Sequence, residues 1–275
     1  MTTFATERAG RPASTLEGRV QVPSAFRKKL LAAALGSAGL LGLLVLWWLG
    51  TDVLAAERSF ARRFSPVAAL PALANLLASG TLWDHILISL QRVLLGLGLG
   101  FAAGVPLGLL VGTSRLAEVA TAPAFQFLRM ISPLSWMPIA IMVFGIGDRP
   151  IYFLLAFAAV WPILLNTAAG VRQLDPNWLQ LSRSLAATRW ETLNRIILPG
   201  ILGHVLTGVR LAIGISWIVL VPCEMLGVQA GLGYFILDAR DRLAYPDLMA
   251  TVLVIGATGF ALDLLARSAV VRMTR

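Results

Sequence analysis

The sequence predicts an all-α, polytopic membrane protein with about six transmembrane helices. Of its 275 residues, 57% are hydrophobic and only 13% are charged. A soluble domain is about half apolar and about one quarter charged, so this composition is typical of a chain that faces lipid. The mean hydropathy of +0.78 agrees with that class. Several apolar runs also reach the roughly 20 residues that a membrane-spanning helix needs.

The apolar runs define the predicted organisation of the chain. The predicted spans cover residues 30–49, 86–111, 120–145, 151–171, 201–226 and 248–266. Lys28 and Lys29 precede the first span and Trp47-Trp48 end it, which favours a cytoplasmic N-terminus. An even number of spans then places the C-terminus in the cytoplasm too. We expect residues 1–28 to form a flexible cytoplasmic tail and residues 29–275 to form a transmembrane domain.

The net charge of +9 does not indicate a nucleic-acid partner. The basic residues are dispersed over many short loops, and the positive-inside rule accounts for their excess. Cys223 is the only cysteine, so the chain has no intrachain disulfide. His85 and His204 are the only histidines and lie far apart, so we expect no metal site.

The sequence also argues against catalysis by this chain. A phosphate-binding loop needs Gly-Lys-[Ser/Thr], and neither Lys28 nor Lys29 follows a glycine. No nucleophile elbow or His-Glu metal motif is present either. We therefore expect a non-catalytic chain that binds no cofactor of its own.

A regular glycine pattern marks the second predicted span. Glycine recurs every four residues, at Gly96, Gly100, Gly104, Gly108 and Gly112. On a helix this spacing forms a stripe without side chains, which allows another helix to approach closely. We interpret the stripe as a helix-packing surface and assign it no chemistry.

Three ionisable residues inside the predicted spans are candidates for a solute pathway: Arg92, Arg210 and Glu224. Such residues are expected to face protein or water and to have a partner. The alternatives for Arg92 are a structural ion pair or snorkelling to the nearby surface. The alternative for Glu224 is an acid anchored by a neighbouring arginine or by water.

The third predicted span is interrupted by Pro123, Pro133 and Pro138. Broken backbone at membrane depth is tolerated where it is buried in protein or lines a cavity. Ser132, Ser135 and Trp136 are therefore further pathway candidates. A kinked helix that serves only packing is the alternative.

Residues 175–199 lie between two spans yet have a helical pattern. Asp175 followed by Pro176 is a helix start, and Trp178, Leu181 and Leu185 form an apolar stripe. A capping box at 188–191 starts a second helix, whose stripe is out of phase with the first. We expect two short helices bent near 186–187, with 199 closing the unit. Such a unit suits docking into a soluble partner, although an ordinary interfacial helix is also possible.

The stretch SRSLAATRWETLNRIILPG resembles the EAA loop of bacterial ABC-transporter permeases. Gln180, Leu181 and Ser182 stand where that motif has Glu-Ala-Ala, and Ala186 stands where it has glycine. The end of the motif matches at Ile196, Leu198 and Pro199. The resemblance implies that the loop docks into an ATPase subunit. The residues it assigns to this coupling are Gln180, Leu181, Ser182, Arg183, Leu185, Ala186, Arg189, Trp190, Leu198 and Pro199.

Other segments extend the resemblance over about residues 65–266. SLQRVLLGLGLGFAAGVPLGLLVG and GVRLAIGISWIVLVPCEMLG resemble the same family, and SPLSWMPI resembles its nitrate, sulfonate and taurine branch. The resemblance implies a type I ABC importer permease fold in a bacterial inner membrane. It implies a homodimer of this chain, two cytoplasmic ATPase subunits that bind ATP and Mg²⁺, and a substrate-binding protein outside.

The resemblance leaves the solute open. A small anion such as nitrate, a sulfonate or taurine is the first expectation, and a heteroaromatic precursor such as a thiamine pyrimidine is the alternative. From other functional classes, an ATP-independent secondary transporter and a membrane-bound enzyme remain. The first would need inverted repeats, of which the sequence gives no convincing sign.

Overall fold

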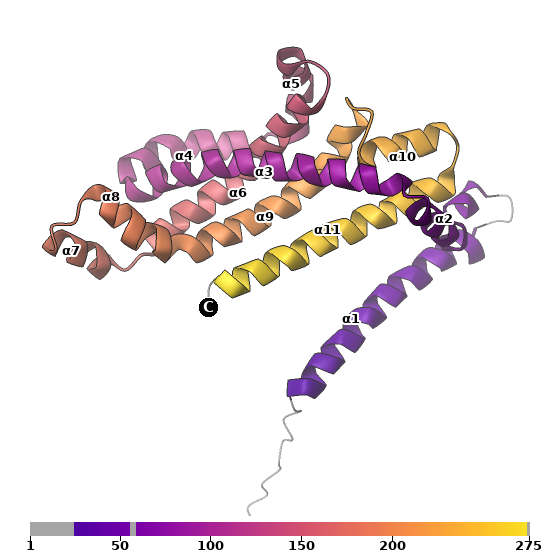
Figure 1. The fold of residues 1–275 in the computed structure, drawn as a ribbon, viewed down its shortest axis with the longest axis horizontal. Coiled ribbons are helices and arrows are strands. Elements are labelled where there is room, and N and C mark those ends of the chain that lie inside the picture. Colours follow the sequence, from indigo (N-terminus) through magenta and orange to yellow (C-terminus); the bar gives the residue numbers. More distant parts are fainter. Residues whose placement is uncertain (1–24, 56–58, 274–275) are drawn as a thin grey trace, which may run out of the picture.

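A computed structural model describes residues 25–55 and 59–273 of the chain, and its secondary structure there is helical throughout (Figure 1). The long helices are α1 (Ala25–Trp48), α3 (Thr81–Thr113), α6 (Asp148–Arg172), α9 (Leu198–Met225) and α11 (Tyr245–Met273). The shorter helices are α2 (Pro66–Ala78), α4 (Arg115–Met130), α5 (Met137–Phe144), α7 (Pro176–Ser184), α8 (Arg189–Thr192) and α10 (Leu232–Asp241). The all-α prediction is therefore correct for the described residues.

Five of the described helical segments are long and apolar enough to cross a membrane. They are Ala34–Val53, Thr81–Thr113, Asp148–Arg172, Arg189–Met225 and Tyr245–Met273. A sixth span results if α4 and the segment Pro133–Phe144 are counted together, although they meet at 86°. The expected number of about six spans agrees with this result.

The third predicted span is interrupted, as its prolines indicate, and the alternative of one kinked helix is not observed. Residues 120–145 do not form one kinked helix, because α4 ends at Met130 and a 3₁₀ turn, Pro133–Trp136, leads into α5. Pro133 supplies no backbone N–H and restricts the residue before it to an extended conformation, as seen at Ser132. The missing N–H and the restricted backbone together end the helix instead of bending it.

The core of the molecule is the layer in which α3, α6 and α9 pack along most of their lengths (Figure 1). Large apolar side chains from these helices and from α10 are fully buried where α10 and α11 join the layer. They include Leu82, Ile151, Leu154, Leu155, Leu220 and Leu232. The exposed outer faces remain rich in leucine, as expected for helices that face lipid.

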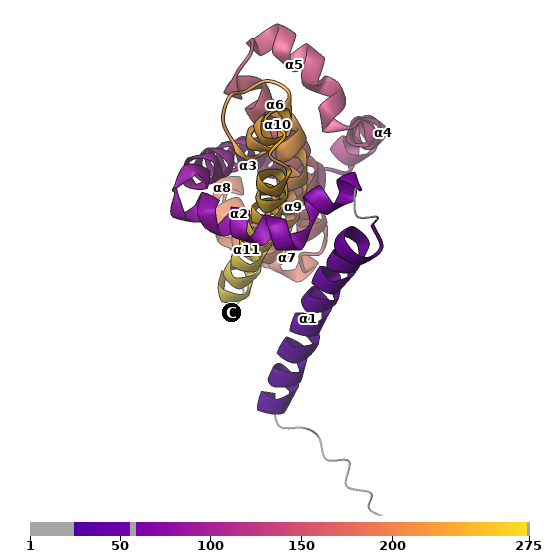
Figure 2. The ribbon, with the colours of Figure 1, turned by 90° about the vertical axis from the view of Figure 1, so that its right-hand side faces the viewer.

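Helix α1 lies apart from this core in both views (Figures 1 and 2). Its contacts with the rest are near its C-terminal end, where Trp47 Nε1 donates to the Phe64 carbonyl at 2.9 Å. Asp52, in the π-helical turn that follows α1, accepts a hydrogen bond from Ser65 at 2.9 Å. The predicted tail, residues 1–28, lies mostly outside the described residues, and α1 begins within it at Ala25.

Candidate functional site

The five glycines of the second predicted span lie where α3 meets α6. A Cβ atom added to any of them would come within 3.0 Å of α6. The α6 residues that they face are also spaced by four: Leu155, Ala159, Ile163, Thr167 and Val171. The row of glycines on α3 therefore faces a row of residues with the same spacing on α6. The absence of side chains on the α3 row permits the close approach of the two helices. The stripe lies inside one chain and determines how its two central helices pack.

The loop at 175–199 folds into two helices, as its capping signals predict. The Asp175 side chain accepts a hydrogen bond from Asn177 N at 2.9 Å and caps α7. Thr188 and Glu191 form the predicted capping box at the start of α8. The bend falls at Ala186, whose φ of 53° is left-handed. Glycine adopts this conformation without strain, which explains the family's glycine at this position.

The two faces of α7 differ. Ser182 is buried and hydrogen-bonded to Thr192 of α8 at 2.6 Å, which ties the two helices together. Leu179 packs on the same inner side, against a cluster that includes Ile197. The predicted apolar stripe points away from this contact, with Leu181 60% and Leu185 73% exposed. Trp178 and Trp190 are exposed as well, as are the remaining predicted docking residues Gln180, Arg183, Ala186 and Arg189.

The end of the loop differs from the expectation. Pro199 does not separate the second short helix from the next span, because α8 continues through a π-helical turn, Leu193–Ile197, into α9. Leu198 N donates to the Leu193 carbonyl in this turn. A π turn accommodates Pro199, which lacks an N–H for the regular α-helical ladder. Helix α8 and the fifth span are thus mechanically one rod, Arg189–Met225.

Arg92 and Glu224 meet in a buried ion pair. Their closest atoms, Arg92 Nη1 and Glu224 Oε1, are 2.7 Å apart, and the side chains are 4% and 0% exposed. Arg92 also forms a 2.7 Å ion pair with Asp148 at the start of α6 and donates to the Ala230 carbonyl at 2.6 Å. This arrangement matches the structural alternative for both residues. It joins α3, α6 and α9 at one end of the core.

The Glu224 carboxylate also forms hydrogen bonds at the start of α10. Ser89 donates to both Glu224 oxygens, at 2.8 and 2.9 Å, and Gly233 N donates to Oε2 at 2.9 Å. The Ser89 oxygen in turn accepts from Leu232 N at 2.9 Å. A carboxylate at a helix N-terminus satisfies free N–H groups and interacts favourably with the helix dipole. Gly231 is required here, because its φ is +113° and a Cβ would collide with Glu224.

Sequence reasoning missed two partners of this network. His85 Nδ1 accepts a hydrogen bond from Gly231 N at 3.0 Å, so this histidine helps to hold the loop before α10. The second partner is Asp148, which pairs with Arg92. The spacing of His85, Ser89 and Arg92, at i, i+4 and i+7, was the available signal, since it puts all three on one helix face.

The other pathway candidates are dispersed. Arg210 pairs with Asp263 of α11 at 3.1 Å, and both side chains are about one third exposed. Asp263 also pairs with Arg267 at 2.7 Å. Ser132 and Ser135 are exposed at the 3₁₀ turn, and Trp136 lies near Phe157 in a tilted arrangement, with ring centroids 5.7 Å apart. The structure therefore does not gather the predicted pathway residues into one site.

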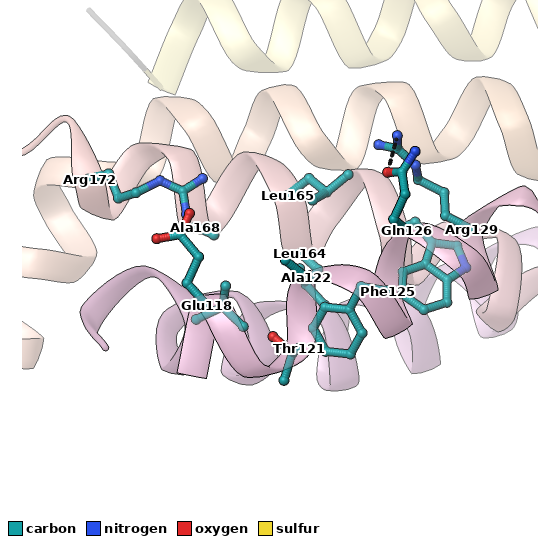
Figure 3. A pocket seen from close by; sticks show the side chains of 12 residues that line it. Glu118, Thr121, Ala122, Phe125, Gln126, Arg129, Leu164, Leu165, Ala168 and Arg172 are labelled. Carbon is teal, nitrogen blue, oxygen red and sulfur yellow. Dashed lines mark hydrogen bonds and ion pairs between the residues drawn. The ribbon is translucent and has the colours of Figure 1, made fainter. Parts of the chain in front are cut away.

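Within the described residues, no group of three or more His, Cys, Asp or Glu side chains is arranged to hold a metal ion. Two cavities lie along α4 and α6. Figure 3 shows the one in which Glu118 and Arg172 pair at one end, 2.9 Å apart, and Gln126 and Arg129 lie at the other. Its walls between these ends are apolar.

Comparison with known proteins identifies the family. Residues 104–275 match the binding-protein-dependent transport system inner membrane component family. The bicarbonate transport system permease protein CmpB of Synechococcus elongatus is 37% identical over 247 residues, which cover 86% of this chain and 88% of that protein. The nitrate import permease protein NrtB of Leptolyngbya laminosa is 35% identical and covers 68% of this chain and 66% of its own length.

Two further comparisons support the same family and its fold. The putative aliphatic sulfonates transport permease protein SsuC of Bacillus subtilis is 32% identical over 74% of both chains. Among solved structures, an inward-facing MetNI methionine ABC transporter chain has a TM-score of 0.57. At 17% identity it covers 73% of this chain and 97% of its own, and this likeness shows the fold. The chain therefore belongs to the family of binding-protein-dependent transport system inner membrane components, the membrane-spanning permeases of ABC importers.

Proposed function

We propose that residues 175–199 are the surface on which an ATPase subunit docks and through which ATP hydrolysis drives transport. The observation that carries this proposal is the two-sided character of α7. Its inner face is fixed by Ser182 and Leu179, while Trp178, Leu181 and Leu185 are exposed and contribute little to packing within the chain. Exposed apolar side chains on a rigid frame are typical of protein interfaces.

The continuity of α8 with α9 gives the docking surface a mechanical role. A partner that moves α7 and α8 also moves the rod Arg189–Met225. The far end of that rod carries Glu224, which is bonded to α3 and α10. A displacement at the loop therefore reaches the opposite end of the bundle through one helix and one buried network. Rigid-body rocking of this kind is a common transport motion.

The assembly that we propose has two copies of this chain, two ATPase subunits and a substrate-binding protein. The loop and both termini face the cytoplasm, and the binding protein acts on the opposite side. ATP and Mg²⁺ belong to the ATPase subunits, since the chain has no phosphate-binding loop.

The substrate that we propose is a small oxyanion. The three relatives carry the names of bicarbonate, nitrate and sulfonate systems, whose solutes share a compact group of negatively charged oxygens. These names favour an anion over a heteroaromatic precursor. They equally favour an ATP-driven importer over a secondary transporter.

Reconstitution with the ATPase and the binding protein tests the function. The chain is purified with both partners and placed in liposomes, and ATP hydrolysis is measured with bicarbonate, nitrate or an alkanesulfonate. We expect one of these anions to stimulate hydrolysis and to accumulate inside. A chain that purifies without an ATPase and moves solute without ATP would overturn the proposal.

A further inference from the structure

The two arginines among the predicted pathway residues are already paired. Arg92 binds Asp148 and Glu224, and Arg210 binds Asp263. Arg129, at the last turn of α4, differs from both. Among the described residues it donates to the neutral Gln126 at 2.9 Å and forms no ion pair. Its guanidinium keeps its full charge and further donors for a ligand.

Arg129 also lines two neighbouring cavities. It lines a cavity of about 350 Å³ together with Trp161 of α6 and Ile215 of α9. It borders the neighbouring cavity of about 160 Å³ as well, where Figure 3 shows it opposite the Glu118–Arg172 pair. The larger cavity opens near the middle of α6 and α9, since its lining residues there are 158–166 and 211–215. That position corresponds to the middle of the membrane.

Two further observations point to a polar ligand in the larger cavity. Ile131 and Pro133, at the break in the chain after α4, line it, and irregular backbone at this depth is tolerated beside a cavity. The buried Trp161 Nε1 has no hydrogen-bond acceptor in the described part of the chain. Its ring is held by Phe125 and Phe157, at centroid distances of 5.7 and 5.6 Å. A buried N–H donor that is fixed in this way favours a ligand that accepts a hydrogen bond.

We infer that Arg129 and Trp161 form an oxyanion-binding point midway along the pathway. A planar guanidinium offers two parallel N–H donors that match two oxygens of a bicarbonate, a nitrate or a sulfonate group. The indole N–H supplies a further donor, and the largely apolar lining of the cavity offers the anion few competing polar groups. This inference rests on the proposed function, because it assigns the residues that select its substrate class.

Arginine variants in the reconstituted complex test the inference. Arg129→Gln removes the charge, and Arg129→Lys keeps it but loses the paired donors. We expect Arg129→Gln to reduce anion uptake about tenfold or more, which corresponds to one lost charge-assisted hydrogen bond. Arg129→Lys should retain an intermediate rate. Assembly with the ATPase should be normal, because Arg129 forms no ion pair with a carboxylate among the described residues.

Two matched variants complete the test. Trp161→Phe removes the N–H and keeps an aromatic ring, so we expect it to raise the anion concentration at half-maximal uptake. Arg272→Gln removes an exposed charge at the end of α11 and should transport normally. Normal uptake by Arg129→Gln would overturn the inference, as would parallel loss of assembly and uptake in Arg129→Gln and Arg129→Lys. A wild-type complex that no anion stimulates would instead overturn the proposed function.

Discussion

Arg92 and Glu224, which are 132 positions apart in the sequence, lie 2.7 Å from each other in the interior of the bundle. Neither charge is left alone, because Asp148, Ser89 and the start of α10 supply the remaining partners. Hydrogen bonds to every member make a buried ion pair tolerable in an apolar interior. The pair and its partners therefore hold α3, α9 and α10 together.

Removing the Glu224 carboxylate should destabilise this end of the bundle. Glu224→Ala leaves the buried guanidinium with one carboxylate and exposes free N–H groups of α10, so we expect about 3 kcal/mol of destabilisation. Thermal unfolding of the purified chain in detergent measures this loss. Asp148→Ala is the control, and since Asp148 is 50% exposed, its effect should be smaller. A Glu224→Ala chain of normal stability that fails to transport would indicate a pathway role instead.

The contact between α3 and α6 should not accept a side chain at its glycines. Gly104→Leu would force atoms against Ile163 and the Val160 carbonyl, which lie 3.0 Å from the position of a Cβ. Overpacking of this kind displaces backbone, so we expect a large loss of folded protein. Gly98→Leu is the matched control, because nothing lies within 4 Å of its Cβ position. Size-exclusion yield of both variants is the measurement, and equal yields would contradict the packing role.

A charge on the exposed stripe of α7 should separate docking from folding. Leu185 is 73% exposed, so Leu185→Asp should leave thermal stability nearly unchanged. The same change should strongly reduce co-purification of the ATPase, because it places an unpaired charge in an apolar interface. Leu243→Asp, at a 64% exposed leucine just after α10, is the control and should bind the ATPase normally. Unaltered co-purification of Leu185→Asp would remove the stripe from the interface.

Arg210 and Asp263 should behave as a pair. Asp263→Ala leaves both Arg210 and Arg267 without their carboxylate, whereas Arg210→Ala leaves Asp263 paired with Arg267. We expect the double variant to transport better than Asp263→Ala alone, with a coupling energy of about 1 kcal/mol in a double-mutant cycle. Additive losses would show instead that Arg210 acts independently of Asp263.

Local sequence signals accounted for much of the fold. The capping residues Asp175 and Thr188 act within three residues of themselves, so the two helices of the loop could be predicted. Glycine spacing likewise revealed a packing face on α3, since the helical period alone puts those residues in line. These features needed no knowledge of which helices are neighbours.

Features that depend on neighbouring elements could not be read from the sequence. The sequence does not indicate that Glu224 lies beside Arg92, because that contact depends on how α3 and α9 pack. It also does not show that Arg129, unlike Arg92 and Arg210, has no carboxylate partner among the described residues. Similarly, Pro199 predicts an interruption on local grounds, yet the π turn before it keeps Arg189–Met225 continuous. The sequence by itself thus determined the membrane class, the helices and their caps, since these follow from composition and short-range spacing. Tertiary structure alone decided which charges are paired and which remain available, because pairing requires contacts between residues far apart in the chain.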